Sequence, residues 1–167
     1  KPSGVVDVVI GTQPSGQGHE TSFAQVVADL IAVPHAAINI IIGDTDIVSV
    51  GGGSHSGRSM RHAGTVISKA VPDLIAKGRA IAALALDTSA DKVEFRDGRF
   101  ATPGSNRSFD FLELAKEAAN LALPEFKSGI AVAADNEMHD PVFPNGCAIC
   151  EVEVDPDTGR VALTRYA

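Results

Sequence analysis

The sequence VVDVVIGTQPSGQGHETSFAQVVADLIAVP occupies residues 5–34 and carries the strongest indication of the fold. Residues 5–10 form a β-branched run that only Asp7 interrupts, which predicts a largely buried strand. A glycine-rich turn follows. From residue 19 the apolar side chains recur at helical spacing, and this pattern ends before Pro34. A strand, a glycine loop and an amphipathic helix therefore follow one another directly.

The same order recurs farther along the chain with different residues. Residues 38–42 predict a second strand, GDTD at residues 43–46 closes it, and residues 51–57 form a second loop of glycine and serine. A second helix is expected over about residues 58–86. Pro72 disfavours helical geometry at the residue before it, so we expect a kink or two consecutive helices.

Two hairpins are predicted in the second half of the chain. Asp97-Gly98 is the strongest short hairpin signal, and it follows a strand expected over residues 92–96. The motif DPDTG supplies turn residues between a strand over residues 147–154 and a strand over residues 161–166.

A third helix is expected between the two hairpins. Ser108 or Asp110 caps it and Pro124 stops it, and residues 130–134 read as a short strand. Strands and helices thus alternate without a regular βα repeat. The predicted fold class is α+β, with a mixed sheet and packed helices, and a doubly wound sheet fits the pattern less well.

The composition and net charge exclude several classes of function. A chain of 167 residues with 44% hydrophobic residues can bury a core, and its net charge of -7 argues against a grip on nucleic acid. No apolar run is long enough for a membrane helix, and two cysteines without a signal segment fit a reducing compartment such as the cytoplasm. Because the chain starts at Lys1 and ends on a predicted strand, we expect a segment of a larger protein.

The first glycine loop, residues 11–21, is the best candidate site. Glycines let the backbone approach a ligand, and the free N–H groups at a helix start attract phosphate. Gln17, Thr21 and Ser22 add neutral hydrogen-bonding groups. An ordinary turn before a helix would show the same composition, and that alternative stays open at this point.

The second glycine loop repeats this design with charge added. Ser56, Arg58 and Ser59 place donors beside another helix start, and residues 51–64 contain two arginines and no acidic residue. Two donor-rich helix starts in one small domain suggest one extended anionic ligand. The alternative is a mobile surface loop whose arginines are solvated.

Other candidate motifs favour structural roles. GDTD has too few oxygen ligands for a calcium loop, so its aspartates are expected to shape a turn. Cys147 and Cys150 lack a second pair for zinc and lie three apart on a predicted strand, so both are interpreted as structural. His19 opens a helix, where it either contacts a ligand or is simply a polar residue at a helix start.

Four motifs, in this order, resemble the large subunits of molybdenum hydroxylases, the family of xanthine dehydrogenase, aldehyde oxidase and aerobic carbon monoxide dehydrogenase. They are GTQPSGQGHETSFAQ at residues 11–25, GDTD at 43–46, GGGSHSGRSMRHAG at 51–64 and FPNGCAICEVEVDPDTGRV at 143–161. The resemblance spans nearly the whole chain, and four ordered motifs make coincidence a poor explanation.

The resemblance implies that residues 1–167 are part of a molybdopterin-binding domain in a larger chain. The implied cofactor is molybdopterin with molybdenum, in bacterial members usually the cytosine dinucleotide form. The positions that match the family's cofactor motifs are Gly16, Gln17, Gly18, His19, Glu20, Thr21, Ser56, Gly57, Arg58 and Ser59.

The implied activity is hydroxylation of aldehydes or N-heterocycles with oxygen from water, or oxidation of carbon monoxide. The implied partners are the remainder of the large subunit, iron–sulfur and flavin (FAD) subunits or domains, and a small-molecule substrate, with no nucleic acid and no membrane. The family's catalytic glutamate lies outside this segment, so neither Glu20 nor Glu137 is expected to be catalytic, and the isolated segment is expected to be inactive. A non-redox module that binds phosphate or a nucleotide, and a scaffold between subunits, remain as alternatives.

Overall fold

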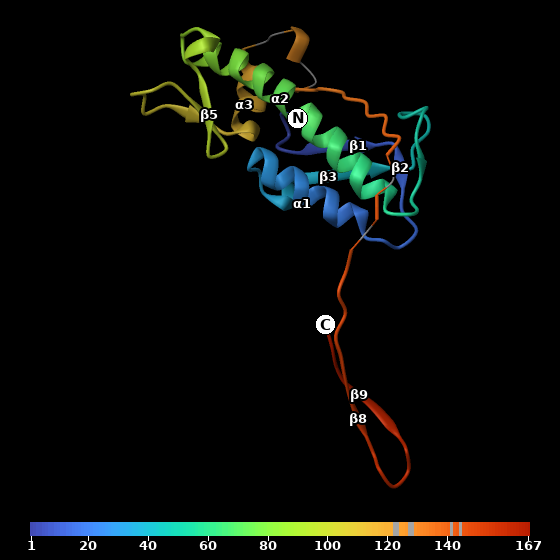
Figure 1. Ribbon diagram of the computed structural model, residues 1–167. Helices are drawn as coiled ribbons and strands as arrows, with labels where there is room; N and C mark the ends of the chain where they lie inside the picture. The colour runs from blue at the N-terminus through green and yellow to red at the C-terminus, as the bar shows by residue number, and fades with distance from the viewer. Residues whose placement is uncertain (122–123, 127–128, 141, 144) are drawn as a thin grey trace.

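The computed structural model describes residues 1–121, 124–126, 129–140, 142–143 and 145–167 (Figure 1). Strand β1 (Val6–Ile10), helix α1 (His19–Ile31) and strand β3 (Ile38–Ile42) form the predicted strand–helix–strand unit. β1 and β3 pair in parallel, from Val6 opposite Ile38 to Ile10 opposite Ile42. They are parallel because α1, with the short 3₁₀ turn His35–Ala37 after it, carries the chain back to the same end.

Helix α2 (Arg58–Ala85) is the longest element and packs against α1. It runs through Pro72 without a break, so the expectation of two consecutive helices is wrong. Pro72 is exposed, and packing along the rest of the helix outweighs the hydrogen bond that proline cannot donate.

The predicted Asp97-Gly98 hairpin is confirmed as β5 (Glu94–Arg96) and β6 (Arg99–Ala101), after a 3₁₀ turn at Ala90–Lys92. A third strand, β7 (Ser108–Phe109), pairs with β6 and was not predicted, because two residues are too few to show alternation. Helix α3 (Phe111–Asn120) follows and packs against α2, with a 3₁₀ turn at Pro124–Phe126 beyond it. Of the two candidate caps, Asp110 is the one used.

The core lies where α1, α2, α3 and the three-stranded sheet meet. Its most deeply buried large side chains are Phe23, Phe100, Ile31, Ile81 and Leu114. The Phe100 ring lies 4.6 Å from the Phe95 ring and 4.9 Å from the Phe111 ring, measured between centroids. These aromatic contacts fix the small sheet against α3.

The last two strands, β8 (Cys150–Val154) and β9 (Val161–Tyr166), form the second predicted hairpin. It projects away from the rest of the molecule, and every residue of both strands is exposed (Figure 1). β8 begins at Cys150 rather than at residue 147, because the chain before it has no ladder partner apart from the paired Ile149 and Ala167.

The α+β class is confirmed, although the parallel and antiparallel pairs occupy four separate small sheets instead of one mixed sheet. The strand expected over residues 130–134 is not formed, because no other strand of the described chain pairs with it. Within the described residues, no helix is long and apolar enough to cross a membrane.

Candidate functional site

The two glycine loops lie side by side, joined by a short parallel ladder. Strand β2 (Thr12–Gln13) belongs to the first loop and β4 (Gly52–Gly53) to the second, and they pair with Thr12 opposite Gly52. The Gly52 N–H also donates to the Gly11 carbonyl oxygen at 2.8 Å. Residues 40 positions apart in the sequence are thereby held in backbone contact.

Both helices at these loops begin in the same unusual way. The residue before α1 is Gly18, with φ 70°, and the residue before α2 is Gly57, with φ 69°. Both glycines adopt the left-handed conformation, and neither helix start receives a hydrogen bond from a capping side chain. Two first-turn N–H groups donate to backbone oxygens, Thr21 to Gly18 at 3.1 Å and Arg58 to His55 at 2.8 Å. The remaining first-turn N–H groups have no side-chain cap and suit an anionic acceptor.

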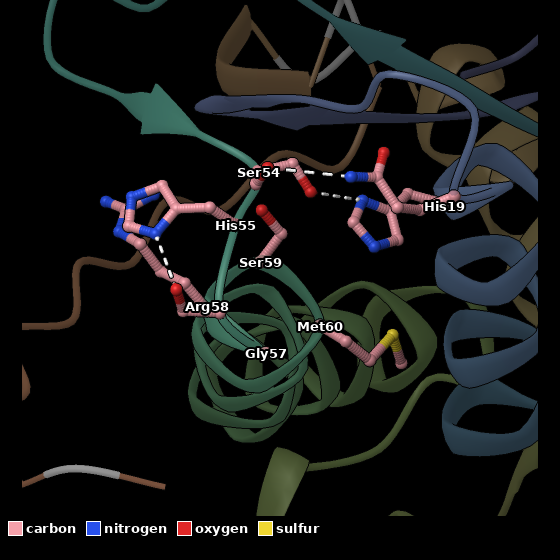
Figure 2. A pocket seen from close by; sticks show the side chains of 9 residues that line it. His19, Ser54, His55, Gly57, Arg58, Ser59 and Met60 are labelled. Atoms are coloured by element: carbon pink, nitrogen blue, oxygen red, sulfur yellow. Dashed lines mark hydrogen bonds between the residues drawn. The ribbon is translucent and has the colours of Figure 1, made fainter. Parts of the chain in front are cut away.

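Side chains connect the two loops at three points, of which Figure 2 shows the two at Ser54. The Gln17 side-chain amide donates to the Ser54 carbonyl oxygen at 3.5 Å, and the Ser54 hydroxyl lies 3.4 Å from His19 Nδ1. The hydroxyl groups of Thr12 and Ser59 lie 2.6 Å apart. Each loop thus fixes the conformation of the other.

Three polar side chains are buried in the described part of the chain, and all three lie at this junction. Thr12 is 6% exposed, His19 is 8% exposed and Ser59 is 3% exposed. Burying a polar group costs free energy unless it is hydrogen-bonded, so this concentration marks a site built for polar contacts. His19 is further fixed by stacking on Phe23, with 5.0 Å between the ring centroids.

A cavity of about 200 Å³ opens between the loops. It is lined by Gln17, His19, Ser54, His55, Ser56, Gly57, Arg58, Ser59 and Met60. Arg58 donates one guanidinium N–H to the Gly53 carbonyl oxygen at 3.0 Å, and its other N–H groups remain to bind a ligand. The lining contains no carboxylate, which suits a negatively charged guest in a chain of net charge -7.

The structure brings together six of the ten predicted site residues in this lining: Gln17, His19, Ser56, Gly57, Arg58 and Ser59. The other four, Gly16, Gly18, Glu20 and Thr21, are exposed around the start of α1 and lie outside the lining. The prediction that the two loops share one pocket is confirmed.

Sequence reasoning missed four residues at this junction: Thr12, Ser54, His55 and Met60. Thr12 is the first polar side chain after β1, and a polar residue just beyond a predicted strand was a usable signal. β1 itself is mostly half-buried and only Ile10 is buried, so the expectation of a largely buried strand is wrong. The inward placement of Met60 and Ser54 carried no comparable signal.

The remaining candidate motifs form no second centre. Asp44 accepts hydrogen bonds from the backbone N–H groups of Asp46 and Ile47, at 2.9 and 3.3 Å, which confirms the turn-shaping role. Cys147 and Cys150 are free and exposed, so packing within this chain does not explain them. Among the residues that the structure describes, no three His, Cys, Asp or Glu side chains gather as metal ligands.

The fold and the pocket define an α+β domain in which two uncapped helix starts converge on one polar, acid-free cavity. A family model described as the molybdopterin cofactor-binding domain matches residues 1–167. The chain belongs to this family.

Known relatives agree with this assignment. The carbon monoxide dehydrogenase large chain of Afipia carboxidovorans is 33% identical over 165 residues, which cover 98% of this chain and 20% of that protein. The gamma subunit of the 6-hydroxypseudooxynicotine dehydrogenase complex of Paenarthrobacter nicotinovorans is 30% identical over 167 residues, covering 99% and 21%.

The solved structures point the same way. A Cu,Mo-CO dehydrogenase in the carbon monoxide reduced state matches with a TM-score of 0.71 and 32% identity, over 99% of this chain and 21% of that one. The present chain therefore spans about a fifth of the length of the curated relatives it matches.

Proposed function

We propose that this chain is one part of the cofactor-binding domain of a larger molybdenum-dependent oxidoreductase, and that the pocket between its two glycine loops holds the phosphate-bearing portion of a molybdopterin cofactor. The observation that carries the proposal is the burial of Thr12, His19 and Ser59 between two uncapped helix starts. Buried hydroxyl, imidazole and amide groups beside an arginine are the donors that a phosphate needs.

The residues present fit such a group. The donors are backbone N–H groups, hydroxyl groups, the Gln17 amide and the Arg58 guanidinium, and the lining contains no carboxylate. Glu20, in the first turn of α1, is exposed and lies outside the lining. A volume of about 200 Å³ is smaller than a typical pocket for a whole drug-sized ligand, so this segment encloses only a portion of a large cofactor. The rest of the cradle is expected from other segments of the full protein.

Each group has a separate role toward the bound cofactor. Arg58 pairs its free guanidinium N–H groups with phosphate oxygens, while Ser56 and Gln17 donate neutral hydrogen bonds. Gly16, Gly18 and Gly57 keep side chains away from the approach to the helix starts. Glu20 and Thr21 lie in the first turn of α1, where they shape the rim. When bound, the cofactor supplies the molybdenum centre at which the substrate is oxidised.

The finer assignments follow the family resemblance. We propose the cytosine dinucleotide form of the cofactor, iron–sulfur and flavin partners that receive the electrons, and a cytoplasmic location. The substrate is a small molecule, either an aldehyde, an N-heterocycle or carbon monoxide, and in each case the oxygen added to the product comes from water. The isolated segment is expected to be inactive, since the catalytic glutamate of the family lies elsewhere.

Molybdenum content of the full-length enzyme tests the proposal. Arg58→Ala removes a charge-assisted contact, so we expect cofactor affinity to fall about tenfold or more, and the molybdenum per polypeptide to fall with it. Gln17→Ala should give a smaller loss. Elemental analysis of the purified proteins provides the measurement.

The matched control is Arg96→Ala, because the Arg96 side chain is 83% exposed in the hairpin of β5 and β6, outside the pocket. Its molybdenum content should equal that of the wild type. Unchanged loading of Arg58→Ala would contradict the assignment of the pocket. Wild-type protein that contains a nucleotide or phosphate but no molybdenum would instead favour a non-redox binding module.

A further inference from the structure

A second and larger cavity runs beside the proposed cofactor pocket. It is a groove of about 1160 Å³, and its walls are β1, one face of α2, the start of α3 and residues 130–137. Most of its lining side chains are apolar, among them Val8, Val66 and Val132. A groove of this size exceeds the range of small-molecule pockets, and such an apolar surface is typical of contact with polypeptide.

One wall of the groove is the open edge of a strand. β1 pairs with β3 on one side and has no strand on the other within the described chain. All five residues of β1 line the groove. Because successive side chains of a strand point to opposite faces, five consecutive lining residues mean that the backbone edge itself faces the groove.

Another wall is a strand-like segment that pairs with no strand of the described chain. From residue 131 to residue 139 the side chains alternate between exposed and half-buried, which is the period of a strand. Eight consecutive residues, 130–137, line the groove, so this segment also presents its backbone edge.

Side chains of α2 hold this segment in an extended form along the helix. Lys77 Nζ donates to the Ala131 carbonyl oxygen at 2.6 Å, Lys69 Nζ donates to Asn136 Oδ1 at 2.7 Å, and Arg61 donates to the Asp140 carbonyl oxygen. The three donors are spaced eight residues apart, which is about 12 Å along a helix. The acceptors are four to five residues apart, which is about 13–17 Å along an extended strand. The segment therefore runs antiparallel to α2 at strand length.

One polar atom in this wall lacks a partner. Asn136 Nδ2 is buried and makes no hydrogen bond. A buried donor without an acceptor destabilises the fold, so an acceptor is expected from whatever fills the groove.

We infer that the groove is filled by at least one apolar β-strand from the part of the same polypeptide that lies outside residues 1–167. This strand pairs with the free edge of β1, faces residues 131–137 and supplies an acceptor to Asn136. An open parallel strand edge beside an apolar groove promotes aggregation, so its cover is present whenever the domain is folded, as a covalently attached segment is. The relatives, of which this chain covers 20–21%, contain ample further chain to supply it.

Photo-cross-linking of the purified full-length protein tests this inference. It rests on the proposal that the chain belongs to a longer polypeptide, but its readout is independent of molybdenum content. A diazirine amino acid is placed at Val66 or, separately, at Val132, and the cross-linked peptides are identified by mass spectrometry. Both positions should cross-link to the same apolar segment outside residues 1–167. The control position is Leu84, which is 57% exposed on α2 outside the groove, and it should not label that segment.

Three outcomes would overturn the inference. The first is cross-links confined to residues 1–167, and the second is cross-links to a different subunit. The third is found by mixing heavy-isotope and normal protein: a cross-link between a heavy and a normal peptide would identify a second copy.

A stability measurement gives an independent check. Asn136→Leu should lower the urea midpoint of the full-length protein more than Lys69→Met, which removes only the contact to Asn136 Oδ1. An equal or smaller loss would mean that Asn136 Nδ2 receives no acceptor.

Discussion

A Cβ atom on Gly51 would lie 2.4 Å from the Gly11 carbonyl oxygen, and one on Gly52 would lie 2.6 Å from an Arg58 guanidinium nitrogen. Real Cβ atoms do not approach backbone so closely, so Gly51 must be glycine for the two loops to touch, whereas a side chain at position 52 would displace the Arg58 guanidinium. Gly18 differs, because a Cβ atom there would meet nothing within 4 Å, while its φ of 70° still favours glycine. At the scale of single residues, glycine serves close packing in the second loop and backbone conformation in the first.

Asp7 gives a pH-dependent prediction at this scale. Hydrogen bonds from the Lys1 side chain and from Asn39 Nδ2, the latter at 3.1 Å, hold the pKa of the Asp7 carboxyl below its usual range. A lowered pKa in the folded state stabilises the protein above the unfolded pKa, and this contribution is lost as the pH falls below about 4. Asn39→Ala should therefore lower the free energy of unfolding by about 0.5–1 kcal/mol near neutral pH and by less below about pH 3. Urea unfolding over a pH series measures this, and a pH-independent loss would contradict it.

At the scale of elements, α2 connects the pocket to the core. Its first turn carries Arg58 and Ser59, and its last turns carry Ile81 against the core. Pro72 interrupts the hydrogen-bond ladder once, opposite the carbonyl of Ser68, yet the 28-residue helix continues past it to Ala85. Buried residues from Ser59 to Ala83 outweigh one missing hydrogen bond, so a single helix joins the core to the site.

Two glycines within α2 provide a matched pair of substitutions. A Cβ atom on Gly64 would meet nothing within 4 Å, whereas one on Gly78 would lie 2.4 Å from Cζ of Phe100. Gly64→Ala should raise the free energy of unfolding by up to about 1 kcal/mol, through the better helix propensity of alanine. Gly78→Ala should lower it by about 1–3 kcal/mol, because a buried phenylalanine must move. Urea unfolding of both variants in the full-length protein measures these changes in the free energy of unfolding. A loss of stability in Gly64→Ala would indicate that another segment packs against this position.

At the scale of the whole molecule, the body and the β8–β9 hairpin differ in kind. The body has a shared core, while the hairpin extends from it (Figure 1). The hairpin carries four cross-strand apolar residues that are each 54–62% exposed, namely Val152, Val154, Val161 and Leu163. Asp155 fixes the turn by accepting hydrogen bonds from the N–H groups of Asp157 and Thr158, at 2.8 and 3.2 Å. These bonds hold the pKa of the Asp155 carboxyl below its usual range. Local hydrogen bonding alone therefore shapes the hairpin within this chain.

This difference between body and hairpin predicts different rates of amide hydrogen exchange in the two parts. A two-stranded hairpin without a packed face is marginally stable in water. Its backbone amides should therefore exchange at nearly the rate of an unfolded chain, while those of the core helices are protected. In the purified 167-residue chain, we expect rapid exchange throughout β8 and β9 and slow exchange in α1. Mass spectrometry of peptides from the two regions measures it. Equal protection in both regions would mean that the hairpin is packed against the body or against another molecule.

Local chemistry in the sequence determined the order of the main elements and the two glycine loops, since the period of side chains, the positions of glycine and proline, and the capping of helices all act over a few residues. Only the tertiary structure decided that Thr12 pairs with Gly52 and that the buried Ser59 hydroxyl meets the Thr12 hydroxyl. It also decided that residues 130–137 line the same groove as β1 and pair with no strand of the described chain. The two-residue strands β2, β4 and β7 left no periodicity to read. Such contacts gain their stability from residues distant in the chain, and no local pattern records a partner that only folding brings near.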